Sequence, residues 1–254
     1  MRSLFRSFER RRVRYLVISG QASVLYGAQH FSQDLDVWIE PSKPNVARLL
    51  RALSDLRARV HKLTPRLSLR NLRRGHGFHF IVPPAIYLDV MGQPPRVGGF
   101  AGAARRGERM RTPWGPLPVV AIEDLVELKK TNRAADYDVI TRLALIRLSH
   151  ERAPSTRLLA WVVENVFRAE DLLDVVQRWG RLVPADDAAV RVLRRVGSPA
   201  AAGVDRAARH IARRAQRLQE RGRAYWLPRI DELREWRRRG SLIPEGLPAR
   251  ELLR

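Results

Sequence analysis

The patterns typical of β-strands all fall in the first half of this 254-residue chain, and this division constrains the fold more than any other feature. Short runs rich in β-branched and aromatic residues, either apolar throughout or alternating with polar residues, recur up to about residue 120 and indicate strands. From about Asp136 onward every segment has helical periodicity instead. We therefore predict an α+β fold, in which a small mixed-sheet domain over residues 1–150 precedes an α-helical domain over residues 151–254, with a boundary near Ser149–Thr156.

Local patterns predict the individual elements. The expected strands cover residues 13–18, 34–40, 78–82 and 86–91, followed by a hairpin around Pro113-Trp114-Gly115. Pro83-Pro84 joins the third and fourth strands, most simply as a hairpin. An amphipathic helix ends near Arg57, and another helix begins in "IEDLVELKK", where acids come first and lysines last, as the helix dipole favours. Gly180 and the cluster Gly197-Ser198-Pro199 mark turns within the helical domain.

The chain is strongly basic. It has 48 lysines and arginines against 26 acidic residues, a net charge of +22, and only four of the basic residues are lysines. A compositional bias toward arginine explains why the basic residues are mostly arginine rather than lysine. It does not explain why basic residues outnumber acidic ones. A field of this size attracts polyanions, so we expect contact with nucleic acid or nucleotides.

Composition also bears on compartment and metal chemistry. Without cysteine, the chain has neither disulfides nor thiolate ligands, so any metal must bind oxygen or imidazole. No apolar run approaches the length of a membrane span, and the arginine-rich N-terminus lacks the apolar core of a secretory signal. We expect a soluble, cytoplasmic protein that does not associate with membranes.

Two carboxylates, Asp34 and Asp36, lie two residues apart in an alternating run, "DLDVWIE". Side chains at i and i+2 of a strand point to the same face, and two adjacent carboxylates oppose each other's ionisation unless a cation lies between them. Oxygen ligation selects Mg²⁺ or Mn²⁺. Asp89, inside the apolar run "IYLDVM", offers a third ligand, because a carboxylate there is costly unless it is paired or metal-bound. His76 and His79 fall on opposite faces of a strand, so we do not expect them to bind metal together.

A glycine turn lies just upstream of this pair. The run "VRYLVI" ends at Ser19-Gly20-Gln21, and a short helix follows. A loop that leaves a strand and opens a helix presents free backbone N–H groups to an anion. We expect Gly20 to let a phosphate approach the backbone closely.

Together these residues resemble the nucleotidyltransferase (polymerase-beta-like) superfamily, and within it most closely the AbiEii/AbiGii-type toxins and the minimal-nucleotidyltransferase-like proteins. The resemblance covers roughly residues 13–145. It rests on the strand–Gly–helix unit, on a second glycine followed by the Asp-x-Asp pair, and on the later strand aspartate. In this sequence the matching residues are Gly20-Gln21, Gly27-Ala28-Gln29-His30-Phe31-Ser32-Gln33-Asp34-Leu35-Asp36 and Asp89.

The resemblance implies metal-assisted transfer of NMP from an NTP to an acceptor hydroxyl. Asp34, Asp36 and Asp89 would be both the catalytic and the metal-binding residues for Mg²⁺ or Mn²⁺, with Asp89 helping to deprotonate the acceptor. The residues that would contact the nucleotide are Gly20, Gln21, His30, Ser32, Lys129 and Arg133. The acceptor would be RNA, such as the 3′ end of a tRNA, or a protein, and a toxin of this kind would have a cognate antitoxin.

The sequence departs from the family pattern at two positions. Gln21 replaces a glycine or serine, and His30 replaces an arginine, which affects nucleotide affinity rather than the metal site. Lys129 and Arg133 lie four residues apart, so we expect them to share a helix face. We expect Asp136 to cap the next helix, with a role as partner of Arg133 as the alternative.

Two other functions stay open. A nucleotidyltransferase fold with a weak or inactive site would serve as a basic module that binds RNA or a partner protein. An antibiotic-modifying nucleotidyltransferase would use the same chemistry, but a chain of charge +22 is a poor electrostatic match for a small cationic acceptor.

Overall fold

The computed structural model describes residues 1–195 and 201–253, which form two compact units. The first unit consists of Met1–Leu128 together with Trp226–Arg254, and the second of Lys129–Tyr225. This division differs from the boundary expected near Ser149–Thr156. The reason is that α7 (Ala135–Ser149) contributes Ala144 and Leu148 to the helical core, so the helical unit begins before residue 150.

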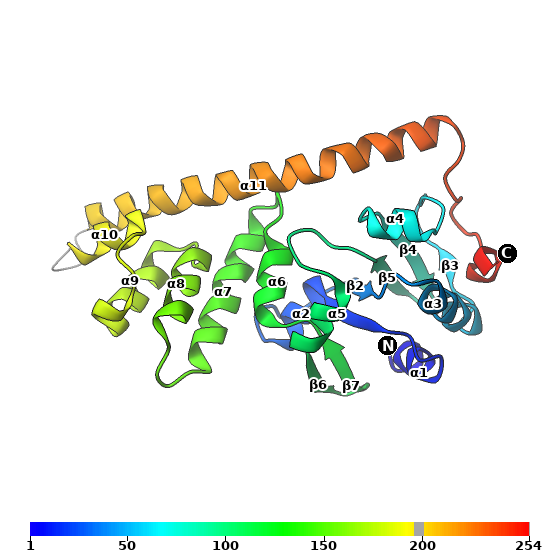
Figure 1. Ribbon diagram of the computed structural model, residues 1–254, viewed down its shortest axis with the longest axis horizontal. Coiled ribbons are helices and arrows are strands. Elements are labelled where there is room, and N and C mark those ends of the chain that lie inside the picture. The colour runs from blue at the N-terminus through cyan, green and yellow to red at the C-terminus, as the bar shows by residue number, and fades with distance from the viewer. Residues whose placement is uncertain (196–200, 254) are drawn as a thin grey trace. The chain divides into compact units, whose positions relative to one another are not determined.

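A seven-stranded mixed sheet forms the centre of the first unit (Figure 1). Its strands are β1 (Tyr15–Ile18), β2 (Leu35–Ile39), β3 (Arg59–Val60), β4 (Gly77–Val82), β5 (Ile86–Met91), β6 (Glu108–Thr112) and β7 (Gly115–Val119). They lie in the order β3-β4-β5-β2-β1-β7-β6. Both predicted hairpins are confirmed, because β4 pairs antiparallel with β5 and β6 with β7. The mixed α/β class with a helical region is confirmed as well.

Six α-helices begin among the described residues of the first unit, which also contain a 3-10 turn at Ala249–Leu253. They are α1 (Arg2–Arg10), α2 (Ser19–Leu25), α3 (Lys43–Asp55), α4 (Leu69–Arg73), α5 (Phe100–Arg106) and α6 (Ile122–Lys129). The sequence analysis did not anticipate α1, although its Leu4, Phe5 and Phe8 form a buried apolar face. The Ser7 hydroxyl on this helix donates to the Ala52 carbonyl of α3 at 3.1 Å, which joins α1 to α3.

The second unit is helical throughout its described residues. It contains α7, α8 (Thr156–Asn165), α9 (Ala169–Trp179), a 3-10 turn at Gly180–Leu182, α10 (Ala188–Arg194) and α11 (Ala201–Arg238) as far as Tyr225. The side chains of Ser155 and Asp187 cap α8 and α10. The turn predicted at Gly180 is confirmed by a positive φ of 49°, whereas the one at Gly197-Ser198-Pro199 lies outside the described residues.

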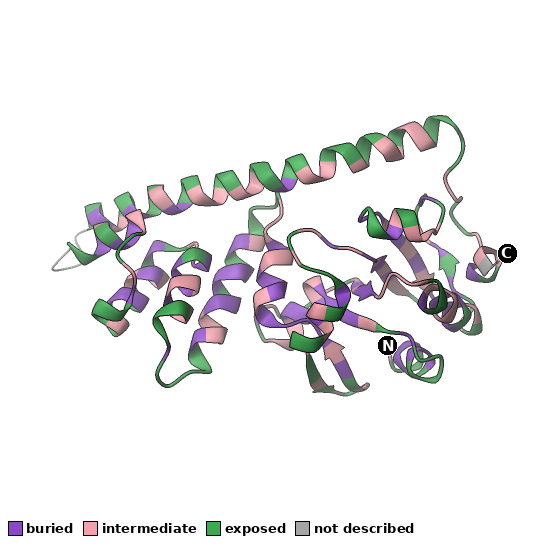
Figure 2. Cartoon of the chain, in the orientation of Figure 1, coloured by how far each residue is buried: buried purple, intermediate pink, exposed green. Residues whose placement is uncertain are grey.

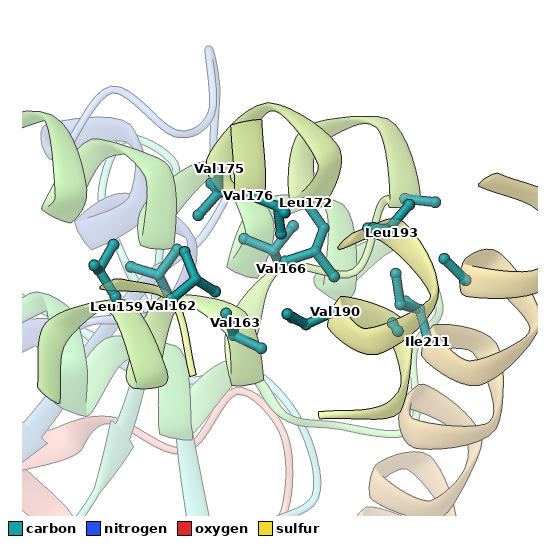
Figure 3. Packing of buried hydrophobic residues seen from close by; sticks show 14 of the residues in the cluster. Leu159, Val162, Val163, Val166, Leu172, Val175, Val176, Val190, Leu193 and Ile211 are labelled. Carbon is teal, nitrogen blue, oxygen red and sulfur yellow. The ribbon is translucent and has the colours of Figure 1, made fainter. Parts of the chain in front are cut away.

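Valine, leucine and alanine side chains from these helices form one hydrophobic core. Figure 2 shows buried residues in purple along α7 and α8. Figure 3 shows how Val162 and Val166 pack toward Leu172 and Val176, with Ile211 of α11 at the edge of the cluster. Segments with apolar residues at helical spacing therefore form helices, as their periodicity predicts.

The last part of the chain completes the first unit. His76 Nε2 lies 2.8 Å from Glu232 of α11, the Arg229 Nε donates to the Arg74 carbonyl at 2.8 Å, and the His76 and Trp236 rings lie 5.0 Å apart. The segment after α11 then joins the sheet. Residues 243–249 hydrogen-bond with residues 58–64, a segment that includes β3, the strand at one edge of the sheet. No strand was expected in this region of the sequence.

Within the described residues, no helix combines the length and the hydropathy needed to cross a lipid bilayer.

Candidate active site

The connection from β1 to α2 is a sharp strand-to-helix turn. Ser19, the first residue of α2, has a φ of +57°, a conformation that residues other than glycine rarely adopt. The turn residue is therefore Ser19 rather than Gly20. Gly20 lacks a side chain for a different reason, because a Cβ there would lie 2.4 Å from the Ser32 Oγ. Its contact with a phosphate remains a prediction.

The loop between α2 and β2 carries several of the predicted nucleotide-binding residues. Ser32 lies against Gly20 and its hydroxyl donates to the Asp34 carbonyl at 2.9 Å, so it fixes the approach to the Asp-x-Asp pair. His30 is exposed beside Phe31, whose side chain is 76% exposed. Gln21, in contrast, is buried, which orients its side chain mainly toward protein rather than solvent.

The register of the sheet brings two of the three predicted carboxylates together. Strands β2 and β5 run parallel, and Asp36 lies directly opposite Asp89. Residues opposite each other in register point to the same face of the sheet, so the two carboxylates are neighbours although 53 positions separate them in the sequence. On its other side Asp36 lies opposite Ile18, the residue before the Ser19 turn. Asp34 directly precedes β2, two residues from Asp36, and is half-buried.

The sequence analysis missed His79 as a residue of this site. His79 of β4 lies opposite Asp89, and its Nδ1 is 2.7 Å from the Asp89 Oδ1. Gly77 lies two residues earlier on the same face, and a Cβ there would make an ordinary van der Waals contact with the ring at 3.5 Å. His79 thereby fixes the orientation of the Asp89 carboxylate. His76, by contrast, directly precedes β4 and contacts Glu232.

The chemistry of this cluster suits a divalent cation in part. Carboxylate oxygens are the ligands that Mg²⁺ and Mn²⁺ prefer, and the register supplies two of them at neighbouring positions, Asp36 and Asp89. No group of three acidic, histidine or cysteine side chains among the described residues is spaced to hold one ion. The pair therefore fits as a two-carboxylate contribution, and the three-ligand site remains a prediction.

Lys129 and Arg133 belong to the second unit and do not share a helix. Helix α6 ends at Lys129 and α7 begins at Ala135, so the expectation of a common helix face is wrong. Lys129 is buried and its Nζ lies 3.2 Å from Asp136, whereas Arg133 is exposed. Asp136 also accepts from the Thr131 hydroxyl at 2.5 Å and therefore anchors Lys129 rather than capping α7.

Comparisons with known proteins give little beyond this geometry. No protein-family model matches the chain, and no curated protein matches it. The solved structure of a protein from Thermotoga maritima, described as a "putative nucleotidyltransferase", is similar to this chain with a TM-score of 0.37 and 13% sequence identity. The similarity covers 59% of this chain and 85% of the other. A TM-score this low carries no argument about activity, so the proposal below rests on the residues themselves.

Proposed function

We propose that this protein is a divalent-metal-dependent nucleotidyltransferase that transfers NMP from an NTP to a hydroxyl group of RNA. The observation that carries the proposal is the in-register pairing of Asp36 with Asp89, next to the strand–helix turn at Ser19. Two carboxylates on neighbouring strands attract a cation, and carboxylate oxygens are the ligands that Mg²⁺ and Mn²⁺ prefer. The pair therefore supports a metal-binding role.

In the proposed reaction the acceptor oxygen bonds to the α-phosphorus, the bond between the α- and β-phosphates breaks, and pyrophosphate leaves. A bound divalent ion would neutralise charge on the triphosphate and on the leaving group. Asp36 and Asp89 would hold it, with Asp34 as the further ligand. We assign the acceptor proton to the Asp89 carboxylate. His79, whose Nδ1 is 2.7 Å from the Oδ1 of Asp89, would act as a positioning residue for this carboxylate.

The remaining residues of the site would bind the triphosphate. Gly20 and Gln21 lie in the first turn of α2, and their backbone N–H groups would donate to an approaching anion. The exposed His30 would donate to a phosphate in place of an arginine, and Ser32 would hold the loop through its bond to the Asp34 carbonyl. RNA is the proposed acceptor because the chain is so basic. A role as the toxin of a toxin–antitoxin or phage-defence system is part of this proposal.

The experiment is transfer of label from α-³²P-NTPs to total RNA in Mg²⁺ or Mn²⁺, with Asp36→Asn as the test variant and Glu40→Gln as the matched control. Glu40 follows the same strand and forms an ion pair with Arg14 in which the Glu40 side chain is half-buried. Labelling should disappear in Asp36→Asn and persist in Glu40→Gln. In parallel, Mg²⁺ should raise the Tm of the wild type but not of Asp36→Asn. This measurement tests the metal site without relying on activity.

One observation favours a second function, the inactive module that binds RNA or a partner. The described residues contain no group of three side chains spaced to hold one metal ion. RNA binding without labelling, across all four NTPs and both metals, would exclude the enzyme and leave that module. Label on the protein itself instead of RNA would retain the chemistry and exclude RNA as acceptor.

A further inference from the structure

The part of α11 that belongs to the second unit carries a row of exposed arginines. Residues 201–225 include seven arginines and two acids. Five of these arginines follow one another at steps of three or four residues, which places them on one side of the helix. All five are exposed, and exposed residues appear in green along α11 in Figure 2. This arginine row consists of Arg206, Arg209, Arg213, Arg217 and Arg221.

The charges of the arginine row are not compensated within the described part of the chain. None of its five guanidinium groups forms an ion pair with a described carboxylate. The later part of the same helix differs: Arg234 pairs with Asp231 at 3.0 Å, and both Arg238 and Arg239 pair with Glu235. One helix therefore has arginines with internal counterions in one segment and arginines without them in the other. The second arrangement favours an external anion.

A cavity lies beside the middle of the arginine row. Arg213 and Arg217 line it together with His210 of the same helix and Arg191 of α10, and its volume is about 240 Å³. This space is larger than a phosphate group and is open to one. Arginines from two helices therefore line one space that is large enough for a small anion.

The acids near this cavity do not cancel its charge. Asp187 accepts the amides of Ala189 and Val190 as the cap of α10, and it also accepts from Arg214 Nη1 at 3.0 Å. Its carboxylate is thus engaged inside the unit, and Arg214, the most buried arginine there, directs its Nη2 to the Val166 carbonyl at 2.7 Å. The exposed Asp186 is the other carboxylate of the cavity. The arginines of the row and Arg191 outnumber it.

We propose that the arginine row and this cavity bind the phosphates of a nucleic-acid strand. Guanidinium groups present a planar fork of donors that matches phosphate oxygens. Each four-residue step along a helix rises about 6 Å, which is comparable with the separation of neighbouring phosphates on a single strand. A membrane surface fits poorly, because a helix that lies in a membrane needs a free apolar face. In this segment Ala207 and Ile211 are buried in the core and Val204 packs against it, so these side chains do not form a free apolar face.

The proposal concerns docking and needs neither NTP nor metal, so it is tested separately from the transfer reaction. Binding of a short, labelled single-stranded RNA is measured by fluorescence anisotropy at several KCl concentrations, without NTP or divalent ions. The test variant is R209Q/R213Q/R217Q, and the control is R234Q/R238Q/R239Q, which removes the same charge from the ion-paired segment of the same helix. Circular dichroism and Tm check that both variants are folded.

The slope of log K against log[KCl] should become shallower by about 2 in the test variant, since each contact with a single strand contributes roughly 0.7. The control should keep the wild-type slope. Equal changes in the two variants would overturn the proposal, because they would mean that the overall field binds RNA. Stabilisation by inorganic phosphate alone, with the RNA slope unchanged in the test variant, would also overturn it. So would loss of binding to phosphatidylserine vesicles in the test variant while RNA binding stayed intact.

Discussion

The contact between His76 and Glu232 predicts a dependence of stability on pH that is specific to the first unit. The His76 side chain is 1% exposed, and its Nε2 lies 2.8 Å from the Glu232 carboxylate. Burial, reinforced by the charges of Arg74 and Arg229, lowers the pKa of His76 to about 4. Glu232 acts in the opposite direction because it favours an imidazolium. We assign the neutral ring, which donates from Nε2, since burial outweighs the single partner.

The magnitude follows from the difference between the folded pKa of about 4 and the ordinary value of 6.5. A proton then binds the unfolded chain more readily than the folded one, so the contribution of His76 is complete above pH 6.5 and is lost as the pH falls toward 4. Between pH 8 and pH 5, linkage gives a loss of about 2 kcal/mol. Below pH 5 the carboxylates begin to titrate as well, so the comparison stops there.

The comparison is between the wild type and His76→Gln, which keeps an N–H donor for Glu232 but does not titrate. Hydrogen exchange of the amides of β4 and β5, measured across this pH range, reports the opening free energy of the first unit. The wild type should lose about 2 kcal/mol more than the variant as the pH falls. Parallel profiles would refute the lowered pKa. A wild type that gains stability on acidification relative to the variant would show that Glu232 holds an imidazolium.

Two further predictions concern the two units separately. Gly20→Ala should break the hydrogen bond from the Ser32 hydroxyl to the Asp34 carbonyl, because the new Cβ would lie 2.4 Å from the Ser32 Oγ. We expect the free energy of unfolding to fall by about 1 kcal/mol. An unchanged Tm would contradict the contact between Gly20 and Ser32. Leu172→Ala in the helical core should cost about 2–5 kcal/mol in urea unfolding, whereas Leu182→Ala, at a side chain 53% exposed, should stay within about 0.5 kcal/mol. Similar losses in the two leucine variants would argue against the described core.

The features that the sequence predicted best, such as the hairpins and the shared face of the Asp-x-Asp pair, depend on local sequence patterns. The turn at Pro83-Pro84 fixes the β4–β5 hairpin, with Val82 opposite Ile86. Counting residues back from that turn places His79 opposite Asp89. The position of His79 in the site could therefore have been predicted from the sequence. The alternation of Asp34 and Asp36 likewise predicted a shared face. Local rules work here because the partners are close in the chain.

Other features depend on pairings that no local pattern encodes. The parallel pairing that brings Asp36 beside Asp89 joins strands separated by about fifty residues, and hydrophobic patterns do not specify such neighbours. The lysines of "IEDLVELKK" indicated the end of α6, but neither glycine nor proline showed that the helix stops before Arg133. The pairing of Lys129 with Asp136 then occupies a lysine that the sequence had assigned to a nucleotide. The positive φ of Ser19 was also hidden, since serine does not predict it.

The bonding of residues 243–249 to the β3 edge has a consequence for the order of events during translation. Residues 58–64 leave the ribosome long before the residues that cover them, so the edge of the sheet stays open while the whole helical unit is being synthesised. An open edge is a template for pairing with other chains, and nascent chains are most prone to misassembly at this stage. A nonsense mutation after Gly240 would delete none of the proposed site residues. The truncated protein would nevertheless lack the segment that covers the β3 edge.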